Sequence, residues 1–215
     1  MQITEIFQSI DGEVNRFGQG GLTTFVRTGG CNLHCCYCDT PKAHNEGRFY
    51  EVKEVYDSVV FLECPKVTIT GGEPLFQYDQ TLALISLLLA REYRVTVESN
   101  GSYGPPDKYL LKDGLGWVFD YKLEFPDAMQ LGMMEKLQKH NWIKFVIQSD
   151  KDYKEAVRVV DYLRRQGSKA SIAFSPCLPD AGLSGAGLVD RMVSSRLWRL
   201  GVSLNLQIHK AISVA

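Results

Sequence analysis

Three cysteines lie close together near the start of the chain, at positions 31, 35 and 38. The spacing C-x3-C-x2-C on one short loop can place three thiolates on three irons of a [4Fe–4S] cluster and leave the fourth iron open to a ligand. A single zinc ion is the alternative, with His34 or Cys36 as a further ligand, but structural zinc sites usually combine two separated pairs of ligands. The downstream sequence supplies no second pair. The pattern favours an open cluster, with Cys36 as an ordinary thiol.

A glycine-rich turn is the second group with chemical potential. Gly71-Gly72-Glu73-Pro74 follows a predicted strand at 66–70. Two glycines let a ligand approach the backbone, and Glu73 can accept hydrogen bonds from an ammonium group. A plain strand-to-helix turn uses the same residue types. Glu98 and Asn100 end the next predicted strand, where they suit a ribose diol or, alternatively, a surface turn.

The cysteine spacing, with an aromatic residue before the last cysteine, resembles the signature of the radical S-adenosylmethionine (SAM) enzymes. The resemblance implies a [4Fe–4S] cluster whose open iron chelates SAM, and cleavage of SAM to a 5′-deoxyadenosyl radical by one electron. It places SAM contacts at these positions: Tyr37, Asp39, Gly72, Glu73, Glu98, Asn100, Lys122 and Ser175.

Motifs from both ends of the chain narrow the resemblance to the 7-carboxy-7-deazaguanine synthase family. They are Phe7-Gln8-Ser9-Ile10-Asp11-Gly12-Glu13, Phe25-Val26-Arg27, Cys38-Asp39-Thr40, Thr70-Gly71-Gly72-Glu73-Pro74 and Leu206-Gln207-Ile208-His209-Lys210. In that family, 6-carboxy-5,6,7,8-tetrahydropterin loses ammonia in a radical-mediated ring contraction. The resemblance therefore implies a carbon–nitrogen lyase of queuosine or other 7-deazapurine biosynthesis.

The same resemblance implies a substrate site and partners. Pterin contacts are expected at Ile10, Asp11, Gly12, Glu13, Arg27, Thr70, His209 and Ala215. The hydroxyl of Thr40 is expected on a Mg²⁺ ion shared with the substrate, with a helix cap or turn as the alternative role. A homodimer and a flavodoxin-like or ferredoxin-like electron donor also follow from the family.

Two positions depart from the family pattern. Asp11 stands where the family usually has glutamine, and Asp120-Tyr121-Lys122 stands where Ser-Pro-Lys is common. Only Lys122 is carried over with the family role there. Two other assignments compete: a radical SAM activator of glycyl-radical enzymes, and an iron–sulfur electron carrier. The activator does not explain His209, and the carrier leaves Arg27 and the Gly-Gly-Glu-Pro turn unused.

Composition excludes several classes of protein. The 215 residues are 45% hydrophobic, enough for one core, so we expect a single radical SAM domain over 1–215. The net charge is −1 and the basic residues are scattered, which argues against a nucleic-acid partner. The longest apolar run, 82–90, is too short to span a membrane. Clustered cysteines suit reduced, metal-bound thiols in the cytoplasm.

Strand and helix patterns alternate along the chain. We expect strands at 22–28, 66–70, 94–98, 117–121, 143–147, 170–174 and 202–208, and helices at 51–62, 78–91, 134–139, 153–165 and 188–199. This order predicts an α/β fold, an incomplete parallel β/α barrel of the radical SAM type. The candidate residues follow the carboxyl ends of strands, so we expect them on one rim.

Overall fold

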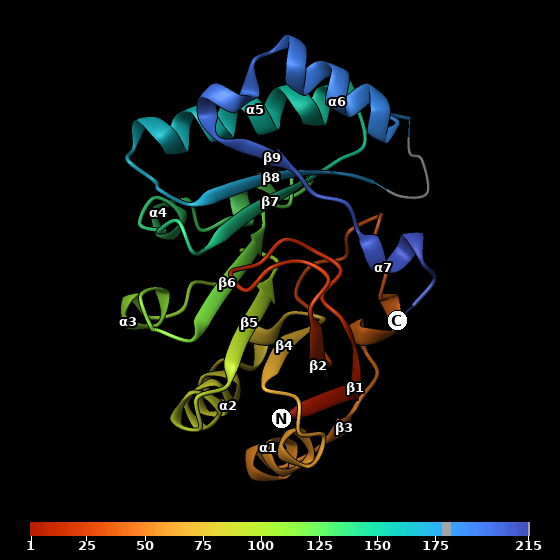
Figure 1. Ribbon diagram of the computed structural model, residues 1–215, viewed down its shortest axis with the longest axis vertical. Coiled ribbons are helices and arrows are strands. Elements are labelled where there is room, and N and C mark those ends of the chain that lie inside the picture. Colours follow the sequence, from red (N-terminus) through yellow and green to blue (C-terminus); the bar gives the residue numbers. More distant parts are fainter. Residues whose placement is uncertain (178–181, 215) are drawn as a thin grey trace.

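The computed structural model describes residues 1–177 and 182–214, and these form one open sheet with helices packed against it (Figure 1). The strand order is β3-β1-β2-β4-β5-β6-β7-β8-β9. The bounds are β1 Gln2–Ile10, β2 Leu22–Thr28, β3 Arg48–Phe49, β4 Lys66–Gly71, β5 Arg94–Ser99, β6 Leu115–Asp120, β7 Trp142–Ile147, β8 Ser171–Pro176 and β9 Val202–Leu204.

In the sheet order, β2 and the strands from β4 to β9 pair with their neighbours in parallel, as the alternating pattern predicts. The strands β1 and β3 are antiparallel additions at one edge. Because β3 and β9 stand at opposite edges, the sheet does not close. The predicted partial β/α barrel is confirmed.

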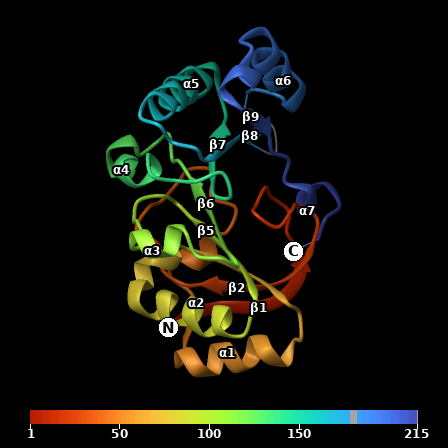
Figure 2. The ribbon, with the colours of Figure 1, turned by 60° about the vertical axis from the view of Figure 1, so that its left-hand side comes forward.

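Four longer helices cover the sheet in two pairs: α1 (Val52–Phe61) lies beside α2 (Tyr78–Ala90), and α5 (Asp150–Arg165) lies near α6 (Gly185–Ser194) (Figure 2). Their amphipathic pattern explains the packing. In α5, Ala156, Val160 and Leu163 recur every three or four residues and are fully buried. The shorter turns are η1 Pro41–His44, η2 Pro74–Gln77, α3 Asp107–Leu110, η3 Pro126–Ala128, α4 Leu131–Met134, η4 Leu197–Leu200 and α7 Ile208–Ala211.

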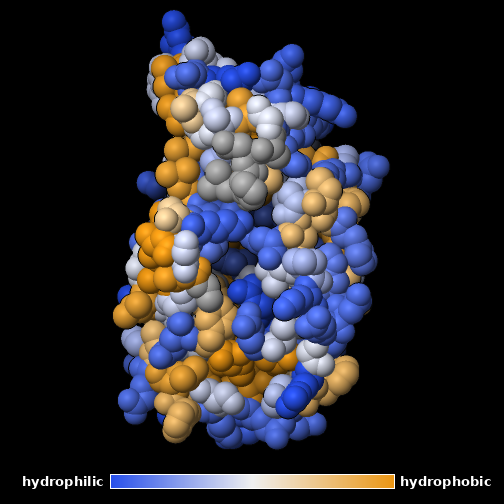
Figure 3. Space-filling model, turned by 90° about the vertical axis from the view of Figure 1, so that its right-hand side faces the viewer, coloured by the Kyte–Doolittle hydropathy of each residue, from blue (hydrophilic) through white to orange (hydrophobic). Residues whose placement is uncertain are grey.

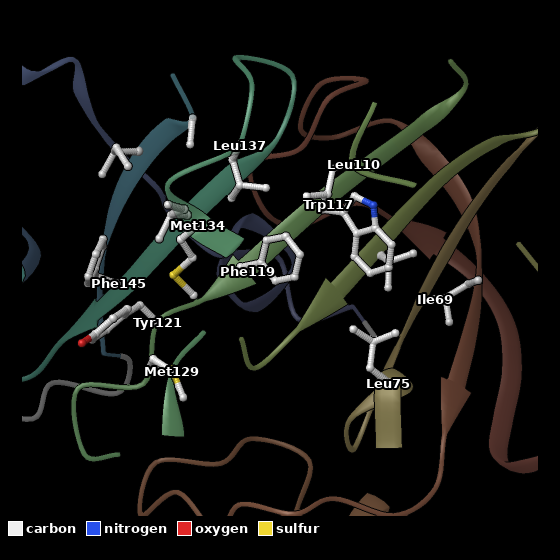
Figure 4. Close-up of a cluster of buried hydrophobic side chains, with 14 of the residues drawn as sticks. Ile69, Leu75, Leu110, Trp117, Phe119, Tyr121, Met129, Met134, Leu137 and Phe145 are labelled. Atoms are coloured by element: carbon white, nitrogen blue, oxygen red, sulfur yellow. The ribbon is translucent and has the colours of Figure 1, made fainter. Parts of the chain in front are cut away.

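Side chains that alternate along β6 divide between the core and a cavity. The rings of Trp117 and Phe119 stack with centroids 5.4 Å apart in the core (Figure 4). Val118 and Asp120 point to the opposite face, because successive side chains of a strand face opposite ways. The core therefore fixes which residues of each strand reach the cavity.

Three expected elements are wrong in their bounds. The helix expected at 134–139 is α4, which ends at Met134. The helix expected at 188–199 stops at Ser194 and restarts as η4 after Arg196, which has a left-handed φ of 54°.

The last strand is the third of these errors. It ends at Leu204 rather than 208, because the side chain of Asn205 binds both Val14 N (3.0 Å) and Ser175 Oγ (3.1 Å). These bonds turn the chain away from the sheet. His209 therefore lies on α7 and not at the end of a strand.

Within 1–177 and 182–214, no helix combines the length and apolar character needed to cross a membrane.

Candidate active site

A cavity of about 420 Å³ opens at the carboxyl ends of the parallel strands. Its volume is in the range of small-molecule sites. Figure 3 shows hydrophilic side chains around a hollow near the middle of that face. The lining includes most of the predicted site residues: Ile10, Gly12, Glu13, Arg27, Cys31, Cys35, Tyr37, Cys38, Asp39, Thr40, Thr70, Gly72, Glu98, Asn100, Lys122 and His209.

The three cysteines of the C-x3-C-x2-C motif all line this cavity, on the loop that leaves β2. Among the described residues, no three His, Cys, Asp or Glu side chains converge on a single metal ion. A [4Fe–4S] cluster does not require such a point, since each thiol binds a different iron. Burial raises the pKa of Cys31, and that of Cys35 to about 11, so iron binding must displace protons there. The donor set fits a cluster.

Cys36 faces away from the cavity lining. Its side chain is exposed, and its thiol donates a hydrogen bond to Glu124 Oε1. The thiols at 31, 35 and 38 are all partly buried. The geometry thus separates Cys36 from the other three, in line with the predicted spacing.

The Gly-Gly-Glu-Pro turn is shaped by the cysteine loop packed on it. A Cβ on Gly72 would come within 2.0 Å of Gly30 O, and one on Gly71, whose φ is +127°, within 2.3 Å of Thr28 O. Glu73 N donates to Gly30 O at 2.8 Å. The glycines therefore admit the backbone of this chain, a close approach that the sequence suggested for a ligand.

Glu73 is fully buried and lies outside the cavity lining. Its carboxylate accepts hydrogen bonds from Leu75 N (2.8 Å), Asn100 N (2.6 Å) and Ser99 Oγ (3.0 Å). Burial raises its pKa to about 7 despite these donors. The structure thus makes Glu73 the link between the ends of β4 and β5, rather than an acceptor facing the predicted SAM ammonium.

Glu98 and Asn100 reach the cavity from the end of β5. Glu98 accepts a hydrogen bond from Thr70 Oγ1 at 2.8 Å, which joins a predicted SAM contact to a predicted pterin contact. Burial raises the pKa of Glu98, and the nearby Glu13 raises it further. Asn100 Nδ2 lies 3.8 Å from Cys31 Sγ and donates to Asn32 Oδ1 at 3.1 Å. The amide therefore faces the cysteine loop.

Asp120 lies between two lysines on the cavity wall. Its Oδ2 lies 2.8 Å from Lys122 Nζ and 3.3 Å from Lys144 Nζ. Burial alone would raise the pKa of Asp120, but the two lysines hold it below its usual value. Lys122 also lies over the Tyr37 ring, 5.2 Å from its centroid. Among the described residues, Asp120 Oδ1 and Tyr37 Oη are buried without a hydrogen-bond partner.

Arg27 and Thr40 meet at one side of the cavity. The guanidinium donates to Glu5 Oε1 at 2.6 Å and to Thr40 Oγ1 at 3.3 Å. It also lies 5.4 Å from the centroid of the Phe7 ring. These contacts hold the residue predicted to bind the substrate carboxylate beside the hydroxyl predicted to bind Mg²⁺.

Residues from the start and the end of the chain also meet in the cavity lining. A Cβ on Gly12 would come within 1.7 Å of His209 Nδ1, so the imidazole lies directly on that glycine. Glu13 accepts a hydrogen bond from Gln207 Nε2 at 2.6 Å and forms an ion pair with Lys144. Burial lowers the pKa of His209, which favours the neutral ring near pH 7.

The sequence of this chain is similar to those of known proteins. A model described as the radical SAM superfamily matches residues 25–184. A 7-carboxy-7-deazaguanine synthase from Clostridium acetobutylicum is 36% identical over 98% of this chain and 95% of its own length. One from Methanospirillum hungatei is 31% identical over 100% of this chain and 86% of its own. The chain belongs to the 7-carboxy-7-deazaguanine synthase family of radical SAM enzymes.

A solved structure supports the fold. The crystal structure of QueE from Escherichia coli has a TM-score of 0.71 and 18% sequence identity, covering 95% of this chain and 92% of that one. At this identity the likeness shows the fold alone. Radical SAM membership itself implies a [4Fe–4S] cluster and SAM, for which the three thiols provide the donor set.

Besides Glu73, two predicted contacts do not line the cavity, Asp11 and Ser175. Asp11 is buried in an ion pair with Lys66 and accepts from Thr68 Oγ1 at 2.6 Å. Its backbone N–H donates to Gly21 O and its C=O accepts from Gly20 N, so the backbone of Asp11 is also bonded within the loop. Ser175 is buried and accepts from Asn205 Nδ2. Ala215 lies outside the described residues, although the preceding Val214 lines the cavity.

The cavity also contains residues to which the sequence analysis assigned no contact. They are Lys144 on β7, Gln207, His44, whose Nε2 lies 3.4 Å from Cys38 Sγ, and Lys210, whose Nζ lies 3.0 Å from Asp39 Oδ2. Lys210 lowers the pKa of Asp39 to about 2, although burial opposes that shift. One signal was available: Lys144 interrupts the apolar run Trp142–Ile147, and a lysine inside a buried strand is unusual.

Proposed function

We propose that this protein converts 6-carboxy-5,6,7,8-tetrahydropterin to 7-carboxy-7-deazaguanine and ammonia. The substrate rearranges and then loses ammonia. The product and ammonia together contain the same atoms and electrons as the substrate, so the reaction needs no net oxidant. One observation carries the proposal: a single cavity joins the three thiols of the cysteine loop to Arg27, Glu13 and His209. The names of the curated relatives support the same reaction.

The substrate end of the cavity offers complementary groups for a carboxylated pterin. Arg27, already oriented by Glu5, can bind the carboxylate through two parallel N–H donors. Glu13 can accept from the amine and amide donors of the ring. The neutral imidazole of His209 offers one donor and one acceptor nitrogen. Together these side chains would hold the substrate in one orientation and exclude water.

The cluster end would hold SAM between the cysteine loop and the ends of β5 and β6. When bound, the cluster and SAM supply the radical that removes a hydrogen atom from the substrate. Glu98, Asn100 and Lys122 line the adjoining wall and are proposed to bind SAM. The unpartnered Tyr37 Oη lies in the same region of the site.

Magnesium is a further part of the proposal, based on Thr40 beside Arg27. Mg²⁺ commonly takes one or two protein oxygens and completes its shell with water and substrate. Thr40→Ala should therefore slow turnover or change its dependence on Mg²⁺ concentration, while the cluster spectrum and SAM binding stay unchanged. Parent-like turnover at every Mg²⁺ concentration would count against a role for this hydroxyl.

The reaction itself is tested by anaerobic reconstitution with iron, sulfide and SAM, followed by mass analysis after adding the carboxylated tetrahydropterin and a reductant. We expect a product lighter than the substrate by one ammonia. An unchanged pterin alongside reductive cleavage of SAM would instead favour a different substrate, as for an activator of glycyl-radical enzymes. A flavodoxin-like or ferredoxin-like donor, a homodimer and a cytoplasmic location complete the proposal on the basis of family resemblance.

A further inference from the structure

Lys144 is a deeply buried lysine in the cavity wall. It lies in the middle of β7 between Ile143 and Phe145, and only 7% of its surface is exposed. Alternation along the strand turns Lys144 and Val146 into the cavity and the two flanking residues into the core. A buried ammonium group is costly unless charged partners surround it. Its partners therefore indicate why a lysine stands here.

Those partners come from two separate parts of the chain. Lys144 Nζ forms an ion pair with Glu13, on the loop after β1, and lies 3.3 Å from Asp120 Oδ2 on β6. Asp120 has a second, shorter ion pair with Lys122, at 2.8 Å. Asp120 thus keeps a cation without Lys144. Lys144 is the cation of the Glu13 carboxylate in the described part of the chain.

The Glu13 carboxylate is held from both sides. Lys144 binds Oε2, and Gln207 Nε2 donates to Oε1 at 2.6 Å. Each carboxylate oxygen has two lone pairs, so one on each remains for a ligand. Two fixed oxygens side by side match two parallel N–H donors, such as the ring N–H and exocyclic amine of an amino-pyrimidinone.

We propose that Lys144 is a positioning residue for the pterin: with Gln207, it fixes the Glu13 carboxylate so that both oxygens accept from the amino-pyrimidinone edge. This inference rests on the proposed function and assigns the edge of the substrate that Glu13 binds. Lys144 acts through Glu13 and does not contact the ligand. Its removal should therefore weaken pterin binding and have little effect on SAM.

The test is a double-mutant cycle on the reconstituted protein. Dissociation constants for the carboxylated tetrahydropterin and for SAM are measured anaerobically in the parent, Lys144→Met, Lys144→Arg, Glu13→Gln and the Met/Gln double variant. Lys139→Met, at an exposed position before β7, is the matched control. Cluster absorbance and thermal unfolding verify each fold, and Lys144→Gln replaces the Met variant if that one does not fold.

We expect Lys144→Met to weaken pterin binding about 10- to 100-fold, as for loss of one hydrogen bond to a charged group. SAM binding should change less than about threefold, and Lys144→Arg should restore most of the pterin affinity. In the Glu13→Gln background, Lys144→Met should add less than about threefold, because the partner it orients is already altered.

Several outcomes would overturn the inference. Fully additive losses would show that Lys144 contacts the ligand directly, and an equal loss of SAM affinity would make it a general structural residue. If Lys144→Arg bound the pterin as weakly as Lys144→Met, the positive charge at this position would not explain the affinity. A parent protein that leaves the pterin unbound overturns the proposed function along with this inference, whereas a parent that binds it confines any failure to Lys144.

Discussion

The two ends of the cavity differ in how their polar groups are satisfied. At the substrate end, Glu13 and Arg27 already have fixed partners within the protein. At the cluster end, the thiols are partly buried, and among the described residues Tyr37 Oη and Asp120 Oδ1 have no hydrogen-bond partner. Buried polar atoms without partners are rare in folded proteins. The substrate end is therefore preorganised, while the cluster end keeps two buried oxygens that could accept a hydrogen bond from a ligand.

The largest expected effect concerns the cluster end. Changing Cys31, Cys35 or Cys38 to Ala should abolish the reconstituted [4Fe–4S] absorbance and all turnover, because each of the three thiols is expected to bind one iron. Cys36→Ala is the control and should retain both, since its thiol bonds Glu124 outside the cavity lining. Loss of the cluster in Cys36→Ala would contradict the prediction that Cys31, Cys35 and Cys38 are its protein ligands.

At the substrate end, adding a single methyl group should be enough to weaken pterin binding. Gly12→Ala places a Cβ within 1.7 Å of His209 Nδ1, so the imidazole must move. Such overpacking costs about 1–3 kcal/mol, so we expect the pterin to bind about 10- to 100-fold more weakly. Anaerobic titration measures this change. The cluster spectrum and SAM binding should be unchanged. Gly132→Ala, with nothing within 4 Å of its Cβ, is the control. Parent-like pterin binding by Gly12→Ala would remove His209 from the preorganised end.

A third prediction uses pH to examine the scaffold beneath the cluster end. Burial raises the pKa of Glu73 from 4.5 to about 7, so between these values the folded protein binds a proton that the unfolded chain has released. Stability of the cluster-free protein should therefore fall as pH rises through this window. Glu73→Gln should remove on the order of 1–3 kcal/mol of that decline, measured by urea unfolding at several pH values. Glu46→Gln, at an exposed position, is the control, and equal pH slopes for parent and Glu73→Gln would contradict the prediction.

The smallest expected effect is at the contact between the two ends. Lys210 on α7 pairs with Asp39 on the cysteine loop at 3.0 Å, and both side chains are partly exposed. Such pairs contribute about 0–1 kcal/mol, less in high salt. Lys210→Met should change the free energy of unfolding by no more than that and leave the cluster spectrum intact. A larger loss would mean that the two ends are strongly coupled through this pair.

The sequence predicted the parallel strands and the shared rim well because apolar strands ending in Gly, Pro or polar residues are strong local signals. Most of the lining residues came from the family resemblance instead, through motifs that carry each contact to a numbered position. Glu73 shows the limit: spacing cannot distinguish a carboxylate that faces a ligand from one that its own turn buries. The end of β9 shows another, since Leu206 and Ile208 continue a strand-like alternation that the distant contacts of Asn205 interrupt. Lys144 was missed because its partners are remote in the sequence.

The return of the chain onto its own beginning has a consequence for synthesis. Asn205 binds Val14, Gln207 binds Glu13, and Ile208 N bonds Gly12 O at 3.0 Å. During translation, residues 205–209 leave the ribosome long after residues 12–14. The cysteine loop and its supporting strands can thus fold on the nascent chain while half of the substrate end has yet to be made. A product shortened after Leu204 would keep the three thiols and Lys144 but lose Gln207, which also holds Glu13, and His209, which covers Gly12.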